Sequence, residues 1–66
     1  MLSEKEEQIV NLLLDKGIEE RIIIATIHAM DTEERQDMMI MYLISVEYLA
    51  EDDVMKAIKD IFFQTE

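Results

Sequence analysis

The side chains that most often carry enzyme chemistry are few in this sequence and lie far apart. There is no cysteine, and His28 is the one histidine. Ser3 stands three residues before Glu6, which is the spacing of a helix cap, and Ser45 lies in an apolar run where its hydroxyl can bond a carbonyl one turn earlier. Nucleophilic catalysis needs such a group beside a base in a cleft that excludes water. We therefore expect no catalytic residue and no enzyme.

Metal and cofactor chemistry is equally short of ligands. The carboxylates gather in two clusters, Glu33, Glu34 and Asp37, and Glu51, Asp52 and Asp53. A calcium loop needs oxygens at alternate positions, a central glycine and a closing glutamate, and neither cluster has that spacing. His28 belongs to no zinc motif, and a single glycine cannot form a phosphate loop. The expected role of the carboxylates is solubility and charge at helix N-termini, so we predict no metal and no cofactor.

The charge balance excludes several kinds of partner. The 66 residues include 16 acidic and 6 basic side chains, a formal net charge of −10. Such a surface repels nucleic-acid phosphates and anionic lipid heads. A helix-turn-helix would need a basic recognition helix, whereas the stretch "TEERQD" has Arg35 as its one base. An acidic acyl carrier would need an Asp-Ser motif, which is absent. We expect no nucleic-acid partner and no membrane partner.

Composition also predicts the compartment and the fold class. No apolar stretch approaches the roughly 20 residues of a membrane span, and the acidic start "MLSEKEEQ" does not predict a signal peptide. The lack of cysteine favours a reducing compartment, so the expected location is the cytoplasm. With no proline and one glycine, residues 1–66 are expected to form a single helical domain.

The first two predicted helices span about residues 4–15 and 19–30. Ser3 and Glu6 form a capping box at the start of the first, and Gly17 suits the left-handed conformation that ends it. In the second, the run "RIIIATIHAM" spreads apolar side chains around most of the circumference, which predicts a central helix buried on several sides. A β-branched run also suits a strand, but the capping signals on both sides favour a helix.

The third predicted helix, at about residues 33–48, carries the longest apolar run. Asp31 or Thr32 caps it, and Glu34 closes an acidic capping box. The run "MMIMYLI", residues 38–44, is apolar all the way round, whereas a surface helix needs an apolar stripe about 100° wide. Part of this run therefore has to face something other than a small core.

A fourth helix, at about residues 53–63 with Glu51 or Asp52 as its cap, completes an all-α bundle of four short helices. Four short helices cannot cover the apolar surplus of the second and third, and large exposed apolar patches are rare on monomers. Six methionines add flexible side chains of the kind that adaptable binding surfaces use. The alternative is that Met38, Met39, Met41 and Met55 merely fill the core.

Helical angles divide the apolar run into two sides. The side expected to face the core holds Ile40, Leu43 and Ile44. The predicted interaction surface holds Met38, Met41 and Tyr42, with Ile23 and Ile27 from the second helix. These angles do not show which of the two sides faces the core, so the reverse assignment stays open.

The stretch Glu6–Ile44 resembles the rhythm of a ubiquitin-associated domain. Residues 16–18, "KGI", stand where such domains carry a Met-Gly-Phe-like turn, and residues 42–44, "YLI", resemble the end of their third helix. The chain departs from that pattern at Lys16, where an apolar residue is expected, and in the β-branched run of the second helix. The resemblance implies a compact helical module, and ubiquitin recognition as the function of that family.

The remaining function is interaction with other proteins. We expect a small acidic, non-enzymatic interaction or regulatory module, homodimeric, that also binds an unidentified protein through its apolar, methionine-rich helix surface. The alternative is an acidic inhibitor or immunity-type protein, with a mobile genetic element as one source, that blocks a basic site with its carboxylates. The two differ in salt response, because an affinity that rests on charge falls as the salt concentration rises.

Overall fold

The first helix, α1 (Glu4–Asp15), begins and ends where its capping residues predict. The computed structural model describes residues 1–65. The Ser3 hydroxyl accepts a hydrogen bond from the Glu6 N–H at 3.2 Å, and the Glu6 carboxylate accepts one from the Ser3 N–H at 2.9 Å. The latter bond is the main reason that the pKa of Glu6 lies below its usual value. Gly17 has φ +76°, which is the left-handed conformation of a helix end. The capping box and the glycine stop are both confirmed.

The next two helices are shorter than predicted. The isoleucine run is helical, as α2 (Glu20–Ala29), and α3 (Glu33–Ser45) ends before the predicted boundary near residue 48. Thr32 caps α3, because its hydroxyl accepts a hydrogen bond from the Arg35 N–H at 3.2 Å. Arg35 therefore occupies the third helical position, and the prediction of an acidic capping box closed by Glu34 is wrong.

The last helix, α4 (Glu51–Thr65), begins earlier and ends later than predicted. Glu51 and Asp52 lie inside its first turn, so the prediction that one of them caps the helix is wrong. The Asp53 carboxylate instead accepts a hydrogen bond from the Ala50 N–H at 3.0 Å, and the Asp53 N–H donates to the Ala50 carbonyl. The side chain that stabilises this helix start reaches back from within the helix.

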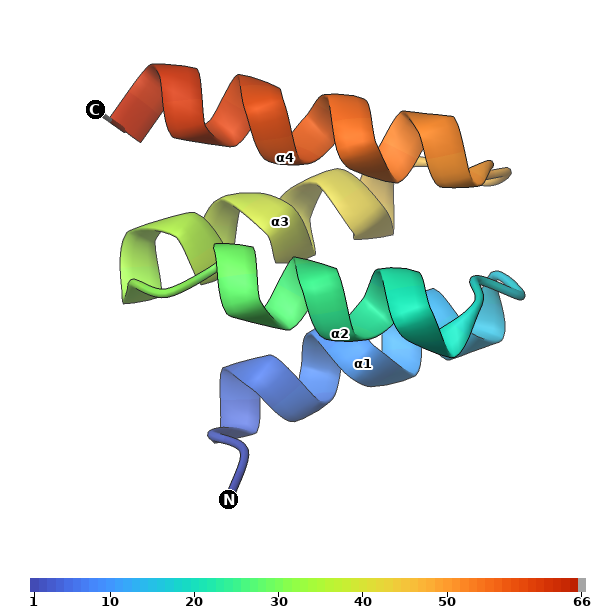
Figure 1. The fold of residues 1–66 in the computed structure, drawn as a ribbon, viewed down its shortest axis with the longest axis horizontal. Coiled ribbons are helices and arrows are strands. Elements are labelled where there is room, and N and C mark those ends of the chain that lie inside the picture. Colours follow the sequence, from blue (N-terminus) through green and yellow to red (C-terminus); the bar gives the residue numbers. More distant parts are fainter. Residues whose placement is uncertain (66) are drawn as a thin grey trace.

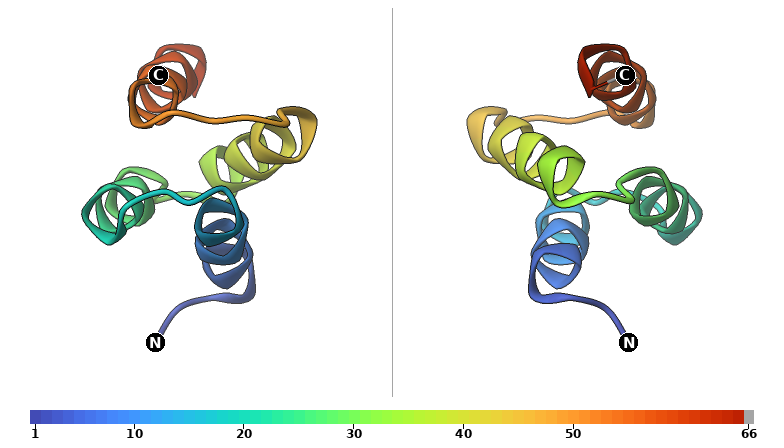
Figure 2. Two further views of the ribbon diagram at one scale, coloured as in Figure 1. Left: turned by 90° about the vertical axis from the view of Figure 1, so that its right-hand side faces the viewer. Right: turned by 90° about the vertical axis from the view of Figure 1, so that its left-hand side faces the viewer.

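Figure 1 shows the four helices running in alternating directions, so that α1 and α3 point one way and α2 and α4 the other. α1 packs against α2 and α3, and α4 packs against the same two helices. α2 and α3 lie on opposite sides in Figure 2, although only a short connection joins them. Residues 1–65 contain no strand, and the predicted all-α bundle is confirmed. The prediction that α2 is central is wrong, since it has two neighbours and Ile24 is 51% exposed.

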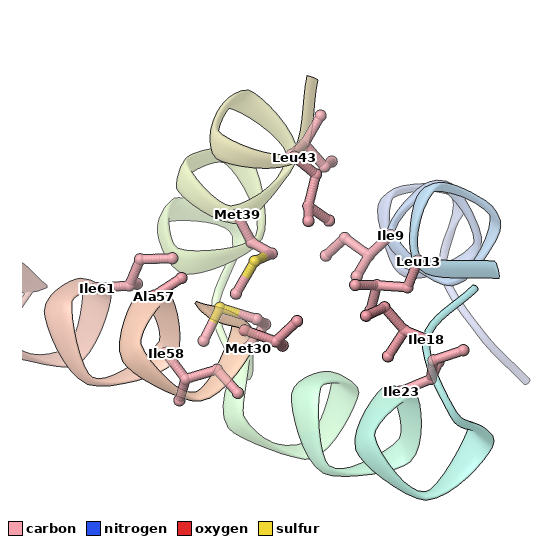
Figure 3. Close-up of a cluster of buried hydrophobic side chains, with 12 residues drawn as sticks. Ile9, Leu13, Ile18, Ile23, Met30, Met39, Leu43, Ala57, Ile58 and Ile61 are labelled. Atoms are coloured by element: carbon pink, nitrogen blue, oxygen red, sulfur yellow. The ribbon is translucent and has the colours of Figure 1, made fainter. Parts of the chain in front are cut away.

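The core lies among the four helices and takes apolar side chains from each of them (Figure 3). Met30 at the end of α2 and Met39 in α3 approach each other near its centre, and neither has exposed surface. The buried apolar residues are Ile9, Leu13, Ile18, Ile23, Met30, Met39, Ile40, Leu43, Val54, Ala57, Ile58 and Ile61. Met39 thus fills the core, as the alternative prediction for the methionines has it, whereas Met41 and Met55 are 71% and 43% exposed.

Two lysines, one in the first turn of α1 and one just after its last residue, hold that helix along α3. Lys5 Nζ lies 2.9 Å from the Asp37 carboxylate and 3.2 Å from that of Glu33, at the start of α3. Its hydrogen bonds to these two groups, with Asp37 the larger cause, raise the pKa of Lys5. At the other end, Lys16 Nζ donates to the Val46 carbonyl at 2.7 Å. Val46 follows the last residue of α3 and has extended backbone, with ψ 140°, so Lys16 bonds the carbonyl of the residue at which the helix has ended.

Arg35 joins the start of α3 to the end of α4. Its Nε donates to Thr65 Oγ1 at 2.8 Å, and its Nη1 lies 2.7 Å from the Asp31 carboxylate. Its guanidinium carbon lies 4.3 Å from the centre of the Phe62 ring, within the range of a cation–π contact. The Arg35 side chain is 18% exposed and that of Asp31 is 60% exposed, so the ion pair is open to solvent, whereas the bond to Thr65 is partly buried.

Two polar side chains are buried among residues 1–65, and both are hydrogen bonded. Thr26 Oγ1 donates to the Ile22 carbonyl at 2.8 Å, one turn earlier in α2. Gln36 Nε2 donates to the Met30 carbonyl at 3.0 Å. Because α2 and α3 do not pack against each other, this bond ties α3 to the end of α2.

Candidate interaction surface

Large apolar side chains remain exposed on all four helices and near the N-terminus. Within residues 1–65 they are Met1, Leu2, Leu14, Ile24, Met41, Ile44, Tyr48, Met55 and Phe63. Single exposed apolar side chains are ordinary on protein surfaces, so the informative observation is where they gather. Three places collect apolar side chains together with the predicted surface residues. A further hollow, in which Tyr48 and Leu49 lie among Asp15, Lys16, Glu47 and Asp53, is more polar.

The first place is a groove between α1 and α2, here called the α1–α2 groove, with a volume of about 430 Å³. It is lined by Leu2, Val10, Leu14, Glu20, Ile23, Ile24, Ile27 and His28. Ile23 is buried beneath it, whereas Leu14 and Ile24 are 56% and 51% exposed at its sides. The two helices therefore leave a solvated apolar channel between them.

The second place, here called the α3 patch, consists of Met41 and Ile44, which are 71% and 64% exposed. Residues three apart are neighbours on a helix surface, so the two side chains lie side by side. The prediction that Ile44 faces the core is wrong, whereas Ile40 and Leu43 are buried as predicted. The buried face of α3 is centred between Met39 and Leu43, and Ile44 lies about 100° from Leu43 around the helix.

The third place is a smaller hollow of about 240 Å³ between α3 and α4, here called the α3–α4 hollow. Half-buried Met38 and Tyr42 line it together with Ala57, Asp60, Ile61 and Gln64. Burial raises the pKa of the Tyr42 phenol, and the charges of Asp53 and Asp60 add to the effect. The phenol thus stays neutral at a wall of the hollow.

The five predicted surface residues are divided among these three places. Ile23 and Ile27 line the α1–α2 groove, Met38 and Tyr42 line the α3–α4 hollow, and Met41 belongs to the α3 patch. They do not form one continuous surface, and their contact with a partner stays a prediction. Leu14 and Ile24 were missed, although a third consecutive leucine beyond a normal apolar stripe was a usable signal.

The two serines have structural partners within their own helices. Ser3 caps α1, and Ser45 Oγ donates to the Tyr42 carbonyl at 2.8 Å. His28 is exposed at the edge of the α1–α2 groove, and neither serine is hydrogen bonded to it. Across residues 1–65, no three side chains of the metal-binding types are placed to hold an ion. No helix in this part of the chain is both long and apolar enough to pass through a bilayer.

Comparisons with known proteins found no family model, no curated protein and no solved structure that matches the chain. The likeness of Glu6–Ile44 to a ubiquitin-associated domain therefore stays a resemblance, and α4 lies outside that stretch. What the molecule can do is inferred from its surface: it offers apolar side chains, in a groove, a patch and a hollow, to whatever packs against them.

Proposed function

We propose that the chain is a small non-enzymatic interaction module that forms a homodimer through the α3 patch. The observation that carries the proposal is the exposure of Met41 and Ile44, side by side on the outer face of α3. Large contiguous patches of exposed apolar side chains are rare on monomers, and they often mark interaction sites. Methionine also adapts its shape to an opposing surface, because its side chain is unbranched and flexible.

The distribution of charge on α3 favours a second copy as the occupant. The acidic residues of α3 are Glu33, Glu34 and Asp37, in its first half, and Lys5 pairs with Glu33 and Asp37. The α3 patch lies in the second half. A two-fold axis through the patch pairs two antiparallel α3 helices, so the acidic starts lie at opposite ends of the pair. Apolar surface is then buried without bringing these carboxylates together.

The size of the chain supports the same arrangement. A chain of about 60 residues buries only about 60% of its unfolded surface, so a single core of this size is marginal. Burial of Met41 and Ile44 against a second copy adds apolar area to each core. Association then stabilises the folded chain by mass action.

The non-enzymatic part of the proposal is supported by the separation of the serines from His28. The lack of cysteine supports a cytoplasmic location.

Sedimentation of the wild-type chain and two matched variants tests the homodimer. At a protein concentration of about 10 µM, a value within the range of specific dimers, we expect twice the chain mass of 7.8 kDa. Met41→Glu places a charge in the patch and should give the monomer mass. Met55→Glu makes the same substitution at an exposed position on α4 and should leave the dimer intact.

Circular dichroism distinguishes lost association from lost folding, because it measures helix content. Both glutamates replace exposed side chains, so the helix content of each variant should equal that of the wild type. A clean wild-type monomer at about 100 µM, a tenfold excess over the first condition, would contradict the homodimer. A dimer that both glutamate variants weaken equally would show that the interface lies elsewhere than the α3 patch.

The acidic excess favours a second candidate function, that of an inhibitor or immunity-type protein acting on a basic site. The sequence has sixteen acidic and six basic side chains, and three of the basic ones form the ion pairs of residues 1–65. Capture of the partner from the source cell, followed by titration at rising salt, separates the two functions. An affinity that collapses between about 50 and 500 mM salt supports the inhibitor, because charge pairs are screened over that range. An affinity that barely changes supports the apolar interface.

A further inference from the structure

The α1–α2 groove is separate from the α3 patch, and we infer that it binds a basic amphipathic helix of a partner protein. The groove is built from helices α1 and α2, whereas the patch lies on α3. The occupant of the groove therefore does not have to be the occupant of the patch. Its shape and the charges along its rim each restrict what fits.

The shape of the groove suits a helix. Along α2 the lining residues run from Glu20 to His28, about 12 Å or a little over two helical turns. Val10 and Leu14 of α1 and Ile24 and Ile27 of α2 line the two sides of this channel. A helix whose apolar side chains recur at three- and four-residue steps can insert a row of anchors into such a channel.

The rim of the groove carries a carboxylate on α1. Glu7 shares a stripe with Val10 and Leu14. Glu4 and Asp15 lie farther round the helix and line other hollows, Glu4 with Glu33 and Asp15 with Glu47. The Glu7 side chain is exposed and forms no ion pair within the part of the chain that the structure describes.

The α2 side adds one more unpaired carboxylate and offers little positive charge. Glu20 itself lines the groove and has no ion-pair partner in residues 1–65. Arg21, next to it, lies 3.5 Å from Glu19 and is partly neutralised there. A helix that carries lysines or arginines on both sides of an apolar face would therefore meet opposite charge on the rim as its anchors enter the groove.

The same observations disfavour two other occupants. A second copy docked groove to groove would bring two sets of these acidic residues together, with Arg21 as the nearby base of each. A small apolar molecule would be poorly enclosed, because the sides of the groove, Leu14 and Ile24, are themselves half exposed. Sites for such molecules usually bury about 70–90% of the ligand surface.

Two synthetic peptides test the inference against the full chain. Each is a helix of about 15 residues with leucines at three- and four-residue steps, and the flanking residues are lysines in one peptide and glutamates in the other. We expect the lysine peptide to bind at least about tenfold more tightly than its glutamate twin, and the difference to shrink as salt rises. Backbone amide shifts in NMR spectra should change most at Val10, Leu14, Ile24 and Ile27.

Substitutions on the groove and on the patch locate the site. Leu14→Ser and Ile24→Ser each remove an exposed side chain and should weaken binding of the lysine peptide about tenfold, with unchanged circular dichroism. Met41→Ser, at an exposed position of the α3 patch, should bind the peptide as the wild type does. Glu7→Gln and Glu20→Gln should each weaken binding and reduce its salt dependence.

Three results would overturn the inference. Equal affinity for the two peptides, or none for either, would show that the acidic rim selects nothing. Wild-type affinity in both serine variants, with amide shifts elsewhere, would place the site outside the groove. A sedimentation mass that falls from dimer to monomer in Ile24→Ser would identify a second copy as the occupant. The homodimer is tested separately, because Met41→Glu changes the sedimentation mass and leaves the groove intact.

Discussion

Replacement of Arg35 by methionine should destabilise the fold far more than loss of one charge on its own would. The variant keeps an unbranched apolar side chain but loses the hydrogen bond to Thr65, the ion pair with Asp31 and the contact with the Phe62 ring. These contribute about 1 kcal/mol, about 0.4 kcal/mol and about 0.7 kcal/mol in the usual ranges, and together roughly 2 kcal/mol. Burial supports this magnitude, since the Arg35 side chain is only 18% exposed.

Urea and thermal unfolding at one fixed protein concentration measure this loss, because association would otherwise shift the result. A 66-residue domain has a free energy of unfolding of roughly 3–10 kcal/mol, so the melting temperature should fall by roughly 10 °C. Arg21→Met is the matched control. It makes the same change in net charge at a side chain that is 79% exposed and 3.5 Å from Glu19, and should cost less than about 0.5 kcal/mol. Equal losses in the two variants would refute the reasoning, because net charge alone would then explain both.

Two further predictions concern a turn and a phenol. Gly17→Ala should lower the free energy of unfolding by about 1 kcal/mol, and Gly17→Asn by less, because φ is +76°. An added Cβ would meet no atom within 4 Å, so the cost comes from the backbone conformation alone. Equal stability of the alanine and glycine chains in urea would contradict this prediction. In Tyr48→Phe the remaining tyrosine is Tyr42, and its ultraviolet titration should have a higher midpoint in the folded chain than in urea, because burial raises its pKa. The contribution of the protonated Tyr42 phenol to the free energy of unfolding is complete below its unfolded pKa of about 10 and is lost as pH rises through its folded pKa. Identical titration midpoints in the folded chain and in urea would count against the burial of this phenol.

Helix boundaries that depend on neighbouring residues could be predicted from the sequence, and those that depend on distant residues could not. Both ends of α1 follow from Ser3, Glu6 and Gly17, which act within one turn of the boundary. The residue after α3 instead bonds a distant side chain, because the Val46 carbonyl accepts from Lys16, thirty positions earlier. No glycine or proline marks that point in the sequence, so the helix was extended too far.

In the candidate site, likewise, the relative positions of side chains on a helix could be predicted, but not which side of the helix is buried. Helical spacing correctly separates Met41 from Ile40 and Leu43, because the angles between side chains are a property of the helix itself. Which of them is buried depends on the two neighbours of α3, namely α1 and α4, and Ile44 falls outside the arc that they cover. Ile24 differs from its prediction for a related reason, since an all-round apolar helix with two neighbours leaves one side uncovered.

The parallel course of α1 with α3, and of α2 with α4, makes the molecule a stack of two helical hairpins (Figure 1). Stacked helical repeats stay soluble because their terminal units present a polar outer face. Here the α1–α2 unit ends the stack with an apolar groove, and the α3–α4 unit ends it with an apolar hollow. Each end therefore has an apolar face, as the inner units of a stacked repeat protein do. A helix seated in the α1–α2 groove would therefore extend the stack by part of a layer, and none of the four existing helices would have to move.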